Sequence, residues 1–174
     1  MSIMPRGADQ LLLPVNPWFL WASLLLALAL NLVPLGPTPW MPDFVALGLV
    51  FWSVHQPRRV GITTAFFFGL LMDVHHGSLL GQHALAYSLL GFFGIAIHRR
   101  VLWFGLSGQM AQVAPAFFAA TLLTLLVRAV AGDGWPGWSV LVAPVAETLL
   151  WPVASLVLLA PQRRPPDPDK NRVL

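Results

Sequence analysis

The stretch Val60-Gly-Ile-Thr-Thr-Ala-Phe-Phe-Phe-Gly-Leu-Leu-Met-Asp-Val-His-His-Gly77 decides how the fold is predicted. Small or acidic residues recur in it at every fourth position, at Gly61, Ala65, Gly69, Asp73 and Gly77. Positions four apart share one face of a helix, and small residues on that face let a second membrane helix approach closely. We therefore predict a membrane helix with a helix-packing or partner-binding face, on which Asp73 is turned toward protein rather than lipid.

The rest of the chain has the composition of a membrane protein. Of its 174 residues, 57% are apolar and 10% are charged, whereas a soluble domain carries about 25% charged residues. The apolar residues form blocks separated by short polar turns, which is typical of an all-α polytopic membrane protein. We predict one transmembrane domain over residues 1–162, followed by a flexible cytoplasmic tail at 163–174. The six expected spans are 18–33, 44–55, 60–74, 84–97, 112–130 and 140–159.

The first apolar block has two interpretations. It follows Arg6 and contains Ala27-Leu28-Ala29, which has the small-x-small form of a signal cleavage site. Its N-terminal region is long and carries a single Arg, so we favour a retained first span.

Positive charges are distributed unevenly across the predicted turns. Nine of the ten Lys and Arg residues fall on one side, and only Arg128 falls on the other. The nine are Arg6, Arg58, Arg59, Arg99, Arg100, Arg163, Arg164, Lys170 and Arg172. Positive residues mark the cytoplasmic side, so both termini are predicted in the cytosol of an inner-membrane protein. The net charge of +3 therefore reflects basic turns available to a partner or to anionic lipid, and we expect no nucleic acid partner.

The polar residues within the spans suggest two local structures. Asp73 either contributes to a binding site or caps the backbone of the turn through Gly77 and Ser78, and we favour the cap because Asp often bonds nearby N–H groups. Arg128 in the fifth span and Glu147 in the sixth lean toward each other if the two helices are antiparallel neighbours. We therefore hypothesise an intramembrane ion pair between Arg128 and Glu147.

Sites for a metal, a cofactor or catalysis are not predicted. The histidines His75, His76 and His83 cluster near the predicted outer face, but adjacent histidines on one turn point about 100° apart and chelate poorly. The chain has no cysteine and none of the common hydrolase, metalloprotease or phosphate-binding motifs. A Ser78–His83 dyad would be a guess, because serine in a glycine turn is usually turn chemistry.

Several motifs carry a resemblance to a known family. They are Pro42-Asp43, Trp52, Arg58-Arg59-Val60-Gly61, Gly69-Leu-Leu-x-Asp73-x-x-x-Gly77-Ser78-Leu-Leu-Gly81-Gln82-His83-Ala84-Leu85-x-Tyr87, and His98-Arg99-Arg100. Together they resemble the rod shape-determining MreD family most clearly over residues 42–100. The resemblance implies a fold similar to the membrane-embedded substrate-binding subunit of energy-coupling-factor transporters. It also implies a non-enzymatic inner-membrane scaffold of the cell-wall elongation complex, without cofactors. The implied partners are MreC, MreB, RodA and its penicillin-binding transpeptidase.

Two other functions remain open at this point. One is a small-molecule binding or transport subunit, with Asp73, Arg128 and Glu147 lining a polar intramembrane pocket. The other is an intramembrane enzyme, for which no residue set can be nominated. Hydropathy does not separate the scaffold from the transport subunit.

Overall fold

The computed structural model describes residues 14–33 and 41–163, and the regular structure of these residues is entirely helical. The six α-helices are α1 (Pro17–Asn31), α2 (Phe44–His55), α3 (Ile62–His76), α4 (Gln82–Val101), α5 (Leu106–Ala131) and α6 (Val142–Leu159). Two short 3-10 segments, η1 (Trp138–Leu141) and η2 (Ala160–Gln162), flank α6. The predicted all-α fold is therefore confirmed. The residues of the predicted tail from 164 onward, and residues 34–40, lie outside the described part.

The helix boundaries lie within about four residues of the predicted spans except at the start of α5. α5 starts at Leu106, six residues before the predicted 112, because the polar Gln109 is accommodated inside the helix. Its amide nitrogen donates to the Phe104 carbonyl at 3.0 Å, and its amide oxygen accepts from the Trp151 indole of α6 at 3.0 Å. α3 ends at Gly77, whose φ of 59° is left-handed, so Gly77 terminates the helix instead of extending its small-residue face.

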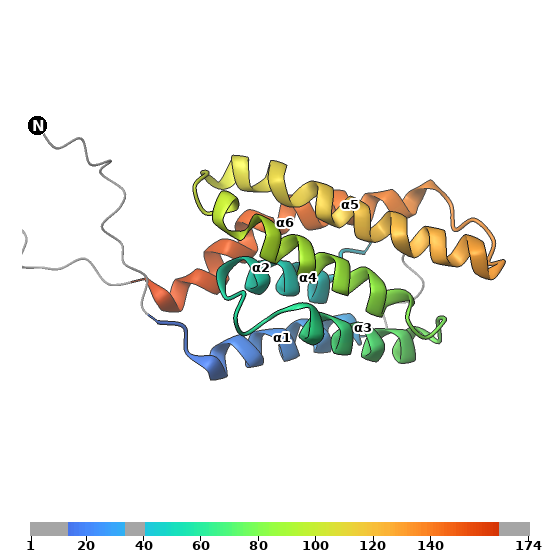
Figure 1. Cartoon of the computed structure of the whole chain (residues 1–174), viewed down its shortest axis with the longest axis horizontal. Helices are drawn as coiled ribbons and strands as arrows, with labels where there is room; N and C mark the ends of the chain where they lie inside the picture. Colours follow the sequence, from blue (N-terminus) through green and yellow to red (C-terminus); the bar gives the residue numbers. More distant parts are fainter. Residues whose placement is uncertain (1–13, 34–40, 164–174) are drawn as a thin grey trace, which may run out of the picture.

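Successive helices run in alternating directions along the bundle (Figure 1). The α2–α3 turn, the α4–α5 turn and the end of α6 therefore lie together at one end, which we call the arginine end. It holds all of the described arginines except Arg128, namely Arg58, Arg59, Arg99, Arg100 and Arg163. The opposite end holds the N-termini of α2, α4 and α6 and the C-termini of α1, α3 and α5.

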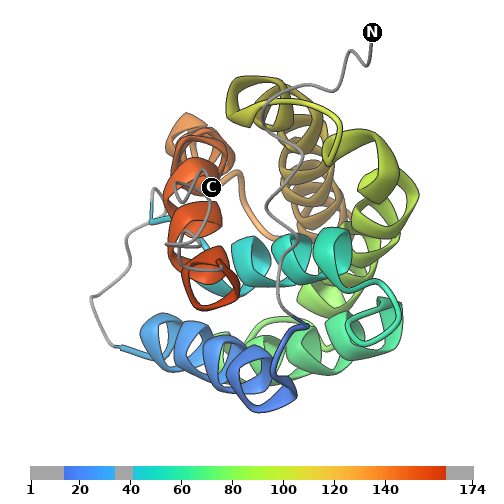
Figure 2. The ribbon, with the colours of Figure 1, turned by 90° about the vertical axis from the view of Figure 1, so that its left-hand side faces the viewer.

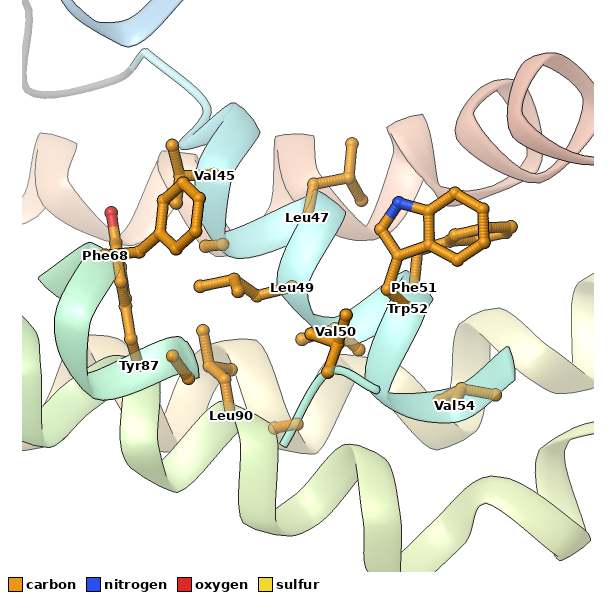
Figure 3. Packing of buried hydrophobic residues seen from close by; sticks show 14 of the residues in the cluster. Val45, Leu47, Leu49, Val50, Phe51, Trp52, Val54, Phe68, Tyr87 and Leu90 are labelled. Carbon is orange, nitrogen blue, oxygen red and sulfur yellow. The ribbon is translucent and has the colours of Figure 1, made fainter. Parts of the chain in front are cut away.

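α2 occupies the middle of the bundle, with the other helices arranged around it (Figure 2). It packs against α1, α4 and α6, and the ten residues from Val45 to Val54 are all buried. Figure 3 shows large side chains of α2, among them Leu49 and Phe51, packed in the same cluster as Phe68 of α3 and Leu90 of α4. The core is thus formed around one short, wholly apolar helix.

The outer surface of the bundle is apolar, whereas its interior contains charged groups. Large apolar side chains such as Leu26, Leu126 and Leu149 are more than half exposed, while Asp73 and Glu147 are buried. This distribution is the reverse of that in a soluble protein and suits a hydrocarbon solvent. Two helical stretches, Leu106–Ala131 and Trp138–Gln162, are long and apolar enough to cross a membrane, and Pro17–Asn31 and Phe44–His55 are apolar but shorter.

Candidate functional site

Asp43 is the centre of a polar network that joins four helices. It is the N-cap of α2, and its Oδ1 accepts from the Ala46 backbone N–H at 2.9 Å and from the Asn31 side-chain amide at 2.6 Å. Its Oδ2 accepts a short hydrogen bond from the Tyr87 hydroxyl. Its own backbone N–H donates to Glu147 Oε1 at 3.2 Å. One residue therefore connects α1, α2, α4 and α6.

The start of α2 is doubly capped within this network. The first N–H groups of a helix have no partner in the helix itself and need acceptors from outside it. Asp43 supplies one acceptor, to Ala46, and Asn31 supplies another, because its Oδ1 accepts from the Phe44 N–H at 3.0 Å. These two bonds stabilise the folded protein, because a buried backbone N–H without an acceptor lowers the free energy of unfolding by about 1–3 kcal/mol.

Asp73 is the centre of a second buried cluster, between α3 and α4. Its Oδ1 accepts from the His83 N–H at 2.7 Å, from His83 Nδ1 at 2.8 Å and from Ser78 Oγ at 3.1 Å. Its Oδ2 accepts from the backbone N–H groups of Gly81 at 2.8 Å and Ala84 at 3.3 Å. The Asp73 carboxylate therefore caps the N-terminus of α4. It does not cap the backbone at Gly77 and Ser78 as we favoured, because those N–H groups donate to the Val74 and Asp73 carbonyls, and the carboxylate bonds only the Ser78 hydroxyl there.

The neighbouring Ser78 and His83 do not form a nucleophile–base pair. Ser78 Oγ lies 3.3 Å from His83 Nδ1, the same nitrogen that contacts Asp73 at 2.8 Å. A catalytic triad needs the carboxylate on one ring nitrogen and the serine on the other. The rings of His76 and His83 are stacked with centroids 5.0 Å apart. Within residues 14–33 and 41–163 no group of three His, Asp or Glu side chains is placed to hold a metal ion.

The small-residue face of α3 packs against α4 of the same chain. A Cβ added to Gly69 would lie only 2.3 Å from Ala84 Cα, so the two backbones touch at this point. One added to Gly91 of α4 would lie 3.2 Å from Ala65 Cβ and 3.5 Å from the Gly61 carbonyl carbon. The predicted helix-packing face is thus occupied within the molecule, and it is not free for a partner helix.

The predicted Arg128–Glu147 ion pair is not among the ion pairs of the described residues. Arg128 Nε instead lies 3.8 Å from Asp133 Oδ2, while Glu147 accepts from the Asp43 N–H. The reason is local: the Asp133 N–H bonds the Arg128 carbonyl at 3.0 Å as α5 ends, which brings the two side chains together at the surface. Glu147 is only 5% exposed and lies deeper, beside α2.

Arg128 and Glu147 nevertheless line the same cavity, which has a volume of about 140 Å³. It lies between α2, α4, α5 and α6, and Asp43, His83 and Tyr87 also line it. At the other end of the bundle, Arg58, Arg59, Arg99 and Arg100 are exposed, and Arg59 Nη1 donates to the Val15 carbonyl at 3.1 Å.

Sequence reasoning did not select Asp43, Asn31 or Tyr87 as site residues. Signals for them were present. Asp43 directly precedes an apolar run, which is an N-cap signature. Tyr87 is the only tyrosine in the chain, and Asn31 ends the first apolar block. The sequence alone did not indicate that Asn31 and Tyr87 both bond Asp43.

The fold and this site together define a class: a helical membrane protein with an apolar exterior, whose buried polar groups bond one another across the helices. The family model for rod shape-determining protein MreD matches residues 14–161, and the chain therefore belongs to the MreD family. This family membership gives the chain a role in determining rod shape.

A relative in Haemophilus influenzae extends the match over most of both chains. The chain is 29% identical over 154 residues to the rod shape-determining protein MreD of that organism. The aligned region covers 84% of this chain and 93% of the relative. No solved structure matches the chain, so the likeness to energy-coupling-factor subunits stays a prediction.

Proposed function

We propose that this protein is a non-enzymatic scaffold of the bacterial cell-wall elongation complex. In this proposal it holds MreC in the inner membrane together with MreB, RodA and the penicillin-binding transpeptidase that works with RodA. The observation that carries the proposal is the use of the polar interior. Asp43 and Asp73 bond helix termini and neighbouring side chains, so these carboxylates serve to hold helices together.

The proposal includes six membrane crossings with both termini in the cytosol. The alternating helix directions and the arginine end support this orientation, since positive turns stay on the cytoplasmic side. α2, with 12 residues, is about 18 Å long, against a hydrocarbon core of about 30 Å. Its central place in the bundle supports its inclusion as a span, because the surrounding helices shield its ends from lipid.

Reporter fusions test the orientation. A reporter inserted at Gly134 is expected to read as external, and one inserted at Arg58 as cytosolic. A third insertion at Trp40, outside the described residues, is also expected to read as external. A cytosolic signal from Gly134 would overturn the six-span topology and the scaffold arrangement built on it.

Cysteine crosslinking tests the scaffold role, and the absence of native cysteine keeps the background low. Because α4 covers the small-residue face of α3, single cysteines belong on outward positions such as Leu25, Leu126 and Leu149, which are exposed. Leu49, fully buried in α2, is the matched control. At least one outward position is expected to crosslink to MreC in rod-shaped cells, and depletion of the protein is expected to round them. Failure of every outward position together with unchanged cell shape would refute the scaffold.

A small-molecule binding subunit is the second candidate, and the cavity beside Glu147 is the observation that favours it. Its volume of about 140 Å³ is below the roughly 300–1,000 Å³ typical of ligand pockets, so we rank this function second. Saturable binding of a vitamin to the purified protein, without a shape defect on depletion, would reverse that order.

A further inference from the structure

The α4–α5 turn at the arginine end forms a largely open groove. Four side chains line it, those of Arg99, Arg100, Trp103 and Phe104, and its volume is about 560 Å³. The backbone of the turn is held in place, because the Trp103 N–H donates to the Arg100 carbonyl and the Phe104 N–H to the Val101 carbonyl, each at 3.2 Å. The groove is therefore built on an ordered turn.

Among the described residues, the charge around this groove is positive and unbalanced. The four carboxylates of the described residues, Asp43, Asp73, Asp133 and Glu147, lie on the opposite half of the bundle. Within 14–33 and 41–163, neither Arg99 nor Arg100 is in an ion pair. Two exposed guanidinium groups with no carboxylate of the described residues nearby favour an anion, and phosphate matches the geometry of their donors.

The aromatic side chains distinguish between possible anions. Trp103 is 89% exposed and Phe104 is 47% exposed, at the end of a helix that we propose to cross the membrane. Aromatic side chains at such positions sit at the level of the lipid headgroups. An acidic protein segment would satisfy the arginines, but apolar surface for the two rings would depend on its other side chains, whereas a phospholipid supplies phosphate and acyl chain in one molecule.

We propose that this groove binds an anionic phospholipid of the cytosolic leaflet. Arg99 and Arg100 bind its phosphate, and Trp103 and Phe104 contact the glycerol and the first part of the acyl chains. The inference rests on the proposed topology, which places this turn at the cytosolic surface. The lipid adds a fixed anchor at the end of α4, the helix that packs against α2, α3 and α5.

Native mass spectrometry of the full-length protein tests the site. The protein in detergent is offered equimolar phosphatidylglycerol and phosphatidylcholine, and retained lipid is counted. The wild type is expected to retain phosphatidylglycerol preferentially. The double variant R99Q/R100Q is expected to bind it about twenty-five-fold more weakly, roughly fivefold for each arginine. R58Q/R163Q is the matched control, because it removes the same charge from the same end without touching the groove, and it should bind as the wild type does.

Each other outcome overturns the proposal. Equal losses in both double variants would mean a diffuse charge effect, and no loss in R99Q/R100Q would mean no site. If inorganic phosphate displaces the lipid signal completely, the groove binds free phosphate. If R99Q/R100Q keeps its lipid but no longer binds an added acidic peptide that the wild type binds, the groove binds an acidic segment. Should that variant fail to fold, Trp103→Ala replaces it, with a severalfold loss expected and an unchanged affinity counting against the site.

The lipid count does not depend on the scaffold experiments. It is made on purified protein, so the failure of the MreC crosslink or of the topology reporters leaves the measured headgroup preference in place. Conversely, a wild type that does not distinguish the two lipids overturns this inference alone.

Discussion

Replacing Gly69 with alanine tests the closest contact between α3 and α4. A Cβ at this position would lie 2.3 Å from Ala84 Cα, 2.5 Å from Ala84 N and 2.6 Å from the His83 carbonyl oxygen. These are backbone atoms, so no side-chain rotation relieves the overlap. An ordinary contact needs about 3.4 Å or more, and α4 must therefore move outward by about 1 Å at this point.

This movement of α4 lowers the free energy of unfolding. Overpacking a tight contact costs about 1–3 kcal/mol, and a clash with rigid backbone belongs at about 3 kcal/mol. Alanine returns about 1 kcal/mol through its helix propensity. The net loss of about 2 kcal/mol corresponds to a fall of roughly 4–8 °C in the thermal midpoint for a chain of this size. Displacing α4 also lengthens the 2.7 Å bond between its His83 N–H and Asp73, which adds to the loss.

Thermal unfolding of the full-length protein in detergent, followed by helical circular dichroism, measures this effect. Gly48→Ala is the matched control, because Gly48 is also a buried helical glycine, but its added Cβ would meet only the flexible Leu24 Cδ2 at 3.3 Å and Ala27 Cβ at 3.9 Å. We expect Gly48→Ala to unfold close to the wild type. If Gly69→Ala also unfolds within about 1 °C of the wild type, α3 and α4 do not touch there and the packing argument fails.

Three further predictions concern the polar interior and use the same unfolding measurement. Asp73→Ala removes the acceptor of three backbone N–H groups at the start of α4 and should cost about 3 kcal/mol or more, with Asp73→Asn intermediate; equal stability of the two variants would contradict the capping role. Tyr87→Phe removes the hydroxyl bonded to Asp43 and should cost about 1.5–3 kcal/mol, as expected for a bond to a charged group; an unchanged midpoint would show that the network does not need this bond. A double-mutant cycle of Arg128→Gln and Glu147→Gln should give a coupling energy below about 0.5 kcal/mol, because the two side chains are not paired; a coupling above about 1 kcal/mol would restore the ion pair.

Local features of the fold were predictable from the sequence. α2 has the predicted bounds, 44–55, since an apolar run follows Pro42-Asp43 and ends before Gln56-Pro57. The start of α5 was missed because Ser107-Gly-Gln109 has the composition of a turn. In the structure the Gln109 amide is satisfied inside the helix by the nearby Phe104 carbonyl and by the Trp151 indole, which lies 42 residues away in sequence.

The site was less predictable, because its bonds are non-local. The capping role of Asp73 follows from short-range turn chemistry, and its partners lie within 11 residues. The bond between Asp43 and Glu147 spans 104 residues, and helical periodicity gives the face of a residue but not the neighbour of its helix. The hypothesised Arg128–Glu147 pair, by contrast, is not among the ion pairs of the described residues because a local partner is present: Asp133, in the turn after α5, lies 3.8 Å from Arg128 Nε.

The central position of α2 constrains how the chain is assembled during synthesis. α4 and α6 enclose this helix, yet both leave the ribosome after it. Until α6 has been inserted, one side of α2 faces lipid or the insertion machinery, and the Asp43 N–H lacks the acceptor that Glu147 later provides. Completion of the bundle therefore waits for the last helix, and a nascent chain released before α6 would present an unfinished interior to membrane quality-control proteases.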